Sequence, residues 1–267
     1  MLHGTLERVR RCATQKGRAQ QGLFVIEGER VVRRALTAGV QLEQVLVAEG
    51  FLEAPHNGAL AQALAQHGVA VERVTSSVLR ELADGRNSGL CIALAKVPPT
   101  PSLQAWLQSR VASEPVCLLV LVNVREPGNV GALMRTALAS AVDALVTLGE
   151  TDPFHPKAVR SSLGSVFKVR HFAATNSAEL SALLRAQGVQ QVAAVAVGGE
   201  PLRTARLSPS LALYVGNEAQ GLPEELIATV DERVTIPMPS GVDSFSVNAA
   251  TAIVLYEIAQ RRYERGP

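Results

Sequence analysis

Short hydrophobic runs alternate with amphipathic stretches along the whole chain. The first hundred residues contain strand-like runs at 22–26, 44–48, 69–74 and 90–95, and helical patterns after Gly28 through Ala38, at 59–67 and at 76–83. Further strand-like runs, separated by helical segments, follow at 116–122, 144–148, 166–172, 191–197, 211–216 and 232–236. Alternation of strands and helices predicts an α/β fold whose mainly parallel sheet is covered on both faces.

A cluster of prolines separates the two series of elements. Pro98, Pro99 and Pro101 can neither continue a helix nor donate hydrogen bonds within a sheet. We therefore expect a first α/β domain over residues 1–97, a linker over 98–114 and a second domain over 115–267. The single tryptophan, Trp106, falls in the linker, where we expect it to pack the two domains together.

Composition narrows the class of protein. The 267 residues are 47% hydrophobic and 19% charged, as in soluble globular proteins. No run approaches the roughly 20 apolar residues of a membrane-spanning helix. The N-terminus is polar and lacks the apolar segment of a secretory signal, so we expect a cytoplasmic protein without a membrane partner. Cys12, Cys91 and Cys117 lack metal-ligand spacing and are expected to be buried thiols, with no metal site.

Positive charge is concentrated near the beginning of the chain. The net charge is only +2, but residues 1–34 hold eight basic residues against three acidic ones. Such a patch suits a phosphate-backbone partner, because each neutralised phosphate releases condensed counterions. The alternative is an ordinary solvated helix face.

Polar and glycine-rich segments follow three of the later strand-like runs directly. They extend from Asn123 to Ala137, from Tyr214 to Pro223 and from Ile236 to Ala250. In an open α/β sheet, ligands bind at the carboxyl ends of the strands, so three such segments predict one shared site.

In this order, the three segments resemble the signature motifs of the SpoU/TrmH family. Members of this family are RNA ribose 2′-O-methyltransferases of the SPOUT superfamily, and they take the methyl group from S-adenosylmethionine. The resemblance covers roughly residues 116–260. A weaker resemblance, over roughly residues 3–96, is to the small RNA-binding domain of the family's rRNA-modifying members. The resemblance of residues 116–260 implies that the second domain has a SPOUT fold with a C-terminal trefoil knot and that it forms a homodimer.

The resemblance also implies roles for individual residues. The matching catalytic positions are Asn129, Arg135, Glu218 and Ser244. The matching cofactor-binding positions are Gly216, Gly221, Ile236, Met238 and Phe245. In the first domain, the residues that match the family's pattern and are expected to contact RNA are Lys16, Arg18, Glu27, Gly28 and Arg30.

The first motif contains the residue with the most specific chemistry. Asn129 is expected to cap a helix, on which Arg135 lies about 130° from the centre of the buried stripe and is therefore exposed. Arg135 matches the position of an arginine that is essential for catalysis in the family. Because a guanidinium with a pKa above about 12 is a poor proton acceptor, we expect Arg135 to stay charged and to bind a phosphate or the developing alkoxide.

The third motif departs from the family pattern. The usual order is Ser-Leu-Asn-Val-Ser, whereas this chain has Ser244-Phe245-Ser246-Val247-Asn248. Ser244 keeps its match, but Ser246 stands where Asn is usual and Asn248 where Ser is usual. We interpret both as polar contacts of the site that have exchanged positions.

The function implied is S-adenosylmethionine-dependent 2′-O-methylation of RNA, most simply of ribosomal (23S-type) RNA because of the additional first domain. One alternative is a non-catalytic RNA-binding or ribosome-assembly protein, which the exchanged Ser and Asn favour slightly. Another is a tRNA or antibiotic-resistance methyltransferase with the same chemistry and a different target.

Overall fold

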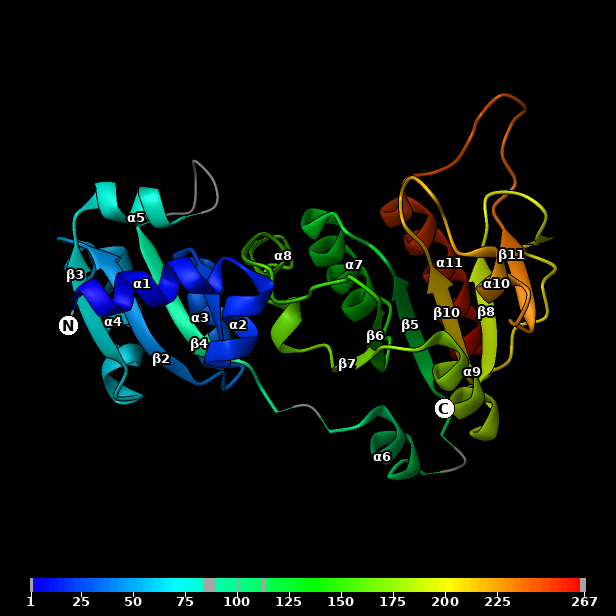
Figure 1. The fold of residues 1–267 in the computed structure, drawn as a ribbon, viewed down its shortest axis with the longest axis horizontal. Coiled ribbons are helices and arrows are strands. Elements are labelled where there is room, and N and C mark those ends of the chain that lie inside the picture. Colours follow the sequence, from blue (N-terminus) through cyan, green and yellow to red (C-terminus); the bar gives the residue numbers. More distant parts are fainter. Residues whose placement is uncertain (1, 84–89, 100, 112–113, 265–267) are drawn as a thin grey trace. The chain divides into compact units, whose positions relative to one another are not determined.

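The chain forms two compact units. The computed structural model describes residues 2–83, 90–99, 101–111 and 114–264. One unit comprises Met1–Pro99 together with Asp152–Lys168, and the other comprises Thr100–Thr151 together with Val169–Pro267. Each is described by itself below (Figure 1).

The first unit is built on a four-stranded mixed sheet. Its strands β1 (Leu23–Glu27), β2 (Leu42–Ala48), β3 (Ala70–Val74) and β4 (Cys91–Lys96) lie in the order β1-β4-β2-β3. β4 is antiparallel to both neighbours, whereas β2 and β3 are parallel. The structure has all four predicted strands and the three predicted helices, as α3 (Glu29–Thr37), α4 (Gly58–Gln66) and α5 (Ser76–Leu82). The sequence patterns did not indicate two helices before β1, α1 (Leu2–Cys12) and α2 (Gln15–Gln21).

Residues 152–168 pack on the first unit, although we expected them in the second domain. The ring of Phe154 lies 4.9 Å from that of Phe24 on β1, and the ring of Phe167 lies 6.3 Å from it. The segment forms α8 (Pro156–Ser161) and a 3-10 turn, η2 (Ser165–Phe167). The predicted strand at 166–172 therefore begins only at residue 171. Leu163 and Gly164, both with positive φ, turn the chain before it.

The second unit contains a seven-stranded sheet in which every pair of neighbours is parallel. The sequence predicted a mainly parallel sheet from six strand-like runs, and it did not indicate the short strand at residues 200–201. The strand order is β7-β6-β5-β10-β8-β11-β9. The strands are β5 (Cys117–Val122), β6 (Ala144–Leu148), β7 (His171–Ala174), β8 (Gln190–Ala194), β9 (Glu200–Pro201), β10 (Leu211–Val215) and β11 (Glu232–Thr235).

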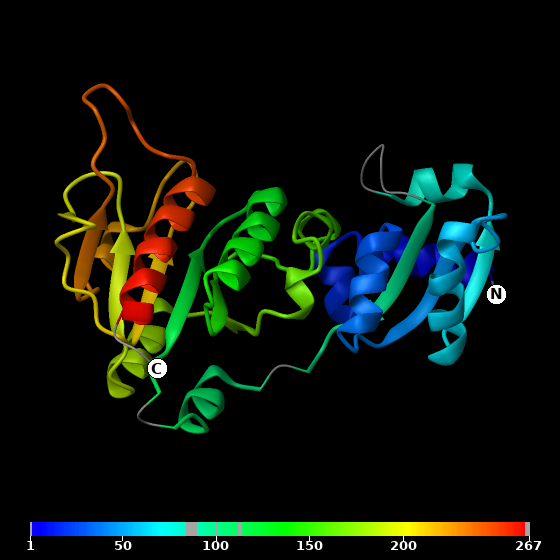
Figure 2. The same ribbon diagram turned by 180° about the vertical axis from the view of Figure 1, so that it is seen from behind.

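Helices cover both faces of this sheet. α7 (Pro127–Ala139) and α11 (Val247–Glu264) lie side by side on one face, whereas α9 (Ser177–Ala186) lies on the other (Figures 1 and 2). The short helices α6 (Leu103–Gln108) and α10 (Glu224–Ile227) join the core on the α9 side. α11 is long and apolar on more than one side: Val254, Leu255 and Ile258 are buried, while Ile253 and Tyr256 are exposed.

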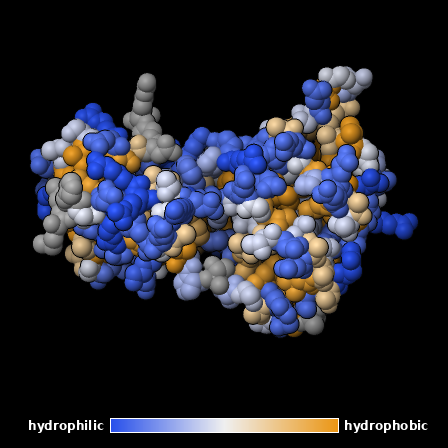
Figure 3. Space-filling view, viewed as in Figure 1, coloured by the Kyte–Doolittle hydropathy of each residue, from blue (hydrophilic) through white to orange (hydrophobic). Residues whose placement is uncertain are grey.

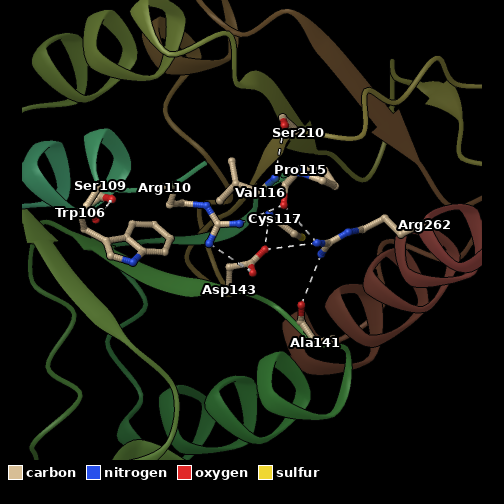
Figure 4. A network of polar contacts seen from close by, with 10 residues as sticks. All are labelled: Trp106, Ser109, Arg110, Pro115, Val116, Cys117, Ala141, Asp143, Ser210 and Arg262. Carbon is tan, nitrogen blue, oxygen red and sulfur yellow. Dashed lines mark hydrogen bonds and ion pairs between the residues drawn. The ribbon is translucent and has the colours of Figure 1, made fainter. Parts of the chain in front are cut away.

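Trp106 belongs to the core of the second unit rather than joining two domains. Its ring lies 5.2 Å from that of Phe172. The guanidinium groups of Arg110 and Arg170 lie 5.2 and 5.3 Å from the indole centroid. Arg110 also pairs with Asp143, which accepts hydrogen bonds from the Cys117 amide and from Arg262 (Figure 4). This network connects α6, β5, the start of β6 and the end of α11.

Candidate active site

A cavity of about 350 Å³ opens at the carboxyl ends of the central strands of the second unit. Its walls come from the ends of β8, β10 and β11, the segments that follow them, and the first turns of α11: residues 194–196, 215–221, 234, 236, 238, 243–245, 247, 250, 251 and 254. The position is the one that the order of strands and polar segments predicted.

All five residues expected to bind the cofactor line this cavity: Gly216, Gly221, Ile236, Met238 and Phe245. A Cβ on Gly216 would lie 2.3 Å from the backbone carbon and oxygen of Gly221, so no larger residue fits there. Gly221 has a φ of +69°, which disfavours any side chain. The two glycines therefore allow a tight turn between β10 and Leu222.

The cavity has the properties that S-adenosylmethionine requires. Its volume is within the roughly 300–1,000 Å³ typical of small-molecule sites. Ile236, Met238 and Val254 give it apolar walls that suit a flat ring, and Glu218 and Asp243 supply carboxylates on its lining for a cationic ligand. The residues that line the cavity therefore fit S-adenosylmethionine.

The three sequence motifs meet through the side chain of Asn129. Its Nδ2 donates a hydrogen bond of 2.5 Å to Oε1 of Glu218 from the second motif. Its Oδ1 accepts one of 2.7 Å from Nδ2 of Asn248 in the third motif. Residues separated by 89 and 119 positions in the sequence are thereby joined at the rim of the cavity.

The prediction that Asn129 caps its helix is wrong. Glu126 is the N-cap of α7, and its carboxylate accepts a 2.7 Å hydrogen bond from the backbone nitrogen of Asn129. Pro127 occupies the first helical turn, where the missing N–H costs nothing. Asn129 lies one turn further on, so its side chain is available to Glu218 and Asn248.

Of the two remaining expected catalytic residues, Ser244 lines the cavity and Arg135 does not. Arg135 is exposed, as the helical periodicity predicts, and no described side chain forms an ion pair with it. Six residues after Asn129, it is rotated by roughly 120° about the helix axis and lies roughly 9 Å further along it. Arg135 is not part of the cavity wall, whereas Ser244 is exposed and lines it.

The structure gives Ser246 and Asn248 separate contacts. Ser246 precedes the first turn of α11: its Oγ accepts a 3.3 Å hydrogen bond from the Ala249 amide, and its carbonyl accepts one of 2.9 Å from the Ala250 amide. Asn248 instead reaches Asn129. Ser246 thus provides contacts at the helix start, and Asn248 provides the contact with the first motif.

Asn123 is a residue of this site that sequence reasoning missed. It has a φ of +52°, and its carbonyl accepts a 3.0 Å hydrogen bond from Nδ2 of Asn217. A Cβ on Gly149 would lie 2.1 Å from Oδ1 of Asn123. Its position directly after a buried strand was a signal in the sequence, because Asn adopts a positive φ more readily than most residues. Asn123 thus connects the ends of β5, β6 and β10.

Two of the five residues expected to contact RNA are buried. Arg18 is 4% exposed; it donates to the carbonyl of Cys12 and pairs with Asp152. Glu27 is 2% exposed and pairs with Arg160. These side chains hold residues 152–168 on the first unit and do not present themselves to a ligand, which corrects the expectation for both. Lys16 and Arg30 are exposed, and Gly28 is half-buried.

Most of the other basic residues in the first unit are paired. Arg8, Arg10 and Arg11 on α1 form ion pairs with Glu43, Glu81 and Glu7. Hydrophilic residues make up much of the face of the first unit that Figure 3 shows, with hydrophobic patches between them. Lys16 and Arg30, which are exposed and form no such ion pair within the described part of the chain, are therefore better able to bind RNA phosphates than the arginines of α1.

The three cysteines are buried and free. Burial raises the pKa of Cys91 and of Cys117 to about 12, so both thiols stay protonated at neutral pH. The described residues contain no group of three or more His, Cys, Asp or Glu side chains placed to hold a metal ion. Within that same part of the chain, no helix is long and apolar enough to cross a membrane.

Comparison with known families gives two matches. Residues 117–256 match the SpoU rRNA Methylase family, and residues 5–93 match the MRM3-like substrate binding domain. A putative TrmH family tRNA/rRNA methyltransferase of Staphylococcus aureus is 27% identical over 249 residues, which are 91% of this chain and 98% of that protein.

Solved structures resemble the chain over nearly its whole length. An rRNA methyltransferase from Sinorhizobium meliloti, with AdoMet bound, is 28% identical with a TM-score of 0.82, and the match covers 96% of this chain and 94% of that one. An RNA 2′-O ribose methyltransferase is 33% identical with a TM-score of 0.81, covering 97% and 96%.

Proposed function

The chain belongs to the SpoU rRNA methylase family, whose members are RNA methyltransferases that use S-adenosylmethionine, and on that premise we propose that it methylates a ribose 2′-hydroxyl of ribosomal RNA. The observation that carries the proposal is the joining of the three motifs through Asn129 at the rim of the cavity. The similarity to a 2′-O ribose methyltransferase supports the position of the methyl group. The match of residues 5–93 to a substrate binding domain supports a structured RNA as target.

S-adenosylmethionine supplies an electrophilic methyl group on a sulfonium. The backbone around Gly216 and Gly221 and the side chains of Ile236, Met238 and Phe245 would hold it. Ser244 and Glu218 lie on the same wall, where they can orient the ribose hydroxyl. Alignment of this kind supplies several of the roughly 8–23 kcal/mol by which enzymes lower barriers.

Arg135 acts on the RNA as a permanent cation. Its guanidinium can bind the phosphate next to the target ribose or the alkoxide as it develops, and the proton passes to water or a neighbouring group. Arg135→Ala is expected to reduce turnover by about 10²–10³-fold, as the loss of a transition-state donor does. Arg135→Lys keeps the charge without the planar fork. Near-full turnover of this variant would exclude bidentate binding.

The protein acts as a homodimer in this proposal. Ile253 and Tyr256 are 38% and 64% exposed on α11, and Leu138 is 40% exposed on the neighbouring α7. A second copy would cover these side chains, and it would also allow Arg135, which is outside the cavity wall of its own chain, to serve the cavity of the partner. Tyr256→Glu is expected to give monomers in analytical ultracentrifugation.

A mixing experiment tests whether the site is shared. Arg135→Ala protomers keep the cavity, and Gly216→Ala protomers keep the arginine but bind S-adenosylmethionine weakly, so the assay is run at a cofactor concentration well below the Kd of the Gly216→Ala protein. If Arg135 serves the partner's cavity, a statistical mixture regains about a quarter of wild-type turnover, because half of the dimers are mixed and each has one complete site. No recovery on mixing would place Arg135 in the site of its own chain.

Tritium transfer from labelled S-adenosylmethionine tests the reaction itself. The purified protein is expected to label ribosomal RNA from a strain that lacks its gene, and to leave wild-type ribosomal RNA and tRNA unlabelled. Alkaline hydrolysis then distinguishes ribose from base methylation, because a 2′-O-methyl group protects the adjacent phosphodiester. Labelling of tRNA alone would overturn the assignment to ribosomal RNA and leave the chemistry standing.

A further inference from the structure

Asn248 is the last member of a directed chain of hydrogen bonds. A carboxylate only accepts hydrogen bonds, so Glu218 requires the amide nitrogen of Asn129. The carbonyl oxygen of Asn129 then faces the other way, and there Nδ2 of Asn248 donates to it. The acceptor-only carboxylate of Glu218 fixes the direction of the chain, and Asn248 completes it by supplying the donor that Oδ1 of Asn129 then requires.

The contacts at both ends are strong enough to orient Asn129. The hydrogen bond to Glu218 involves a charged acceptor, and such bonds are about twice as strong as neutral ones. Asn129 and Asn248 are half-buried, which lessens competition from water. Glu218 is exposed and sits on the turn that follows Gly216, so this chain of bonds is what restrains its carboxylate.

Resting on the proposed function, we propose that Asn248 is a positioning residue: it fixes the amide of Asn129 and, through it, the Glu218 carboxylate at the rim of the cavity. Asn248 makes the contact with the first motif, whereas Ser246 accepts a hydrogen bond at the start of α11. Asn248 does not line the cavity, so it acts through Asn129.

Asn248→Asp tests the direction of the hydrogen bonds. Aspartate has nearly the same shape but cannot donate to Oδ1 of Asn129. The Asn129 amide must then turn its nitrogen toward residue 248, which places its oxygen against the carboxylate of Glu218. We expect kcat to fall by about 10- to 100-fold, the effect of misplacing a reacting group by roughly 1 Å. The Kd for S-adenosylmethionine is expected to change less than about threefold, because the apolar walls, the two glycines and the Asp243 carboxylate stay in place.

A double-mutant cycle tests whether Asn248 acts through Asn129. If it does, Asn129→Ala/Asn248→Ala is no slower than Asn129→Ala alone. Losses in kcat that multiply in the double variant would overturn the proposal. The matched control is Asn176→Ala, which removes another amide from a helix start: Asn176 caps α9 through the Ala178 and Glu179 amides, away from the cavity. This control is expected to lower Tm and leave kcat and KM unchanged.

A spectroscopic readout separates this inference from the proposed function. The side-chain amide signal of Asn129, assigned by its loss in Asn129→Ala, is expected to shift in the full-length Asn248→Asp protein because its hydrogen bonds are exchanged. An unchanged signal overturns the positioning role. If the wild-type protein methylates no RNA, the proposed function fails, and the amide signal still decides whether Asn248 orients Asn129.

Discussion

Gly216 and Gly221 are in backbone contact across the turn that follows β10. Asn217 and Gly221 exchange two backbone hydrogen bonds, of 3.1 and 2.8 Å, and a Cβ at Gly216 would lie 2.3 Å from the Gly221 carbonyl. The same turn carries Glu218 and forms one wall of the cavity. The width of the cavity therefore depends on the absence of a single side chain.

Gly216→Ala is expected to open this turn. Because the obstacle is backbone and cannot rotate away, the variant should bind S-adenosylmethionine at least about tenfold more weakly, or roughly 1.4 kcal/mol. Isothermal calorimetry of the folded protein measures this. Gly58→Ala is the matched control: nothing lies within 4 Å of the added Cβ, and Gly58 has the helical φ of −54°. It should keep the affinity and gain about 0.4–1 kcal/mol of stability. Wild-type affinity in Gly216→Ala would refute the contact.

The two neighbouring cations Lys16 and Arg18 are expected to behave in opposite ways. Lys16 is exposed, so Lys16→Ala should weaken RNA binding, reduce the slope of log K against log salt by about 1 and leave stability unchanged. Arg18→Ala should instead lower the free energy of unfolding by about 3–5 kcal/mol, because it removes a buried guanidinium and leaves the half-buried Asp152 without its partner. Filter binding at several salt concentrations, together with urea unfolding, separates the two effects.

A surface pair provides the control for that comparison. Arg10 pairs with Glu81, and their side chains are 47% and 65% exposed. Arg10→Ala is expected to cost less than about 1 kcal/mol. Equal destabilisation by Arg10→Ala and Arg18→Ala would contradict the buried role of Arg18.

Local patterns were sufficient to predict most strands of the second unit's sheet and the position of its cavity, although they placed the start of β7 too early and did not indicate β9. Runs such as 116–122 and 211–216 are apolar at almost every position, which is typical of strands buried on both faces. The polar segments after them mark the carboxyl edge, where the cavity lies. Helical periodicity likewise predicted that Arg135 is exposed. The trefoil knot and the homodimer stay predictions, because they depend on how the chain threads and pairs.

Long-range pairing explains what the sequence did not predict. The partners of Arg18 and Glu27 lie 134 and 133 residues away, so nothing nearby indicated that these charges would be buried. Asn129 was expected to cap α7 because Asn is a good N-cap, but Glu126 three residues earlier takes that position. The contacts of Ser246 and Asn248 also became clear only when α11 was seen beside α7.

Asp143 holds together segments from four parts of the second unit. It accepts a 2.7 Å hydrogen bond from the Cys117 amide and pairs with Arg110 and Arg262 (Figure 4). Asp143→Ala is expected to lower the free energy of unfolding by about 2–4 kcal/mol, because the amide and two cations lose an acceptor together. Urea unfolding followed by Trp106 fluorescence measures this, since the indole lies beside Arg110. Glu53→Ala, which breaks an exposed pair with Arg73, should cost under about 1 kcal/mol. Similar losses in both variants would contradict the role of the network.

His171 is expected to make the second unit less stable in mild acid. Burial at the start of β7 lowers the pKa of its imidazole below the ordinary 6.5. Between these two values the unfolded chain binds the proton and the folded chain does not, so stability is lost as pH falls below about 6.5, by at most about 1.4 kcal/mol per pH unit. Urea unfolding of wild type and His171→Gln at pH 7.0, 6.0 and 5.0 is expected to show a shallower loss in the variant. His67 is exposed, and His67→Gln should leave the wild-type slope. Parallel curves for wild type and His171→Gln would show that His171 titrates alike in both states.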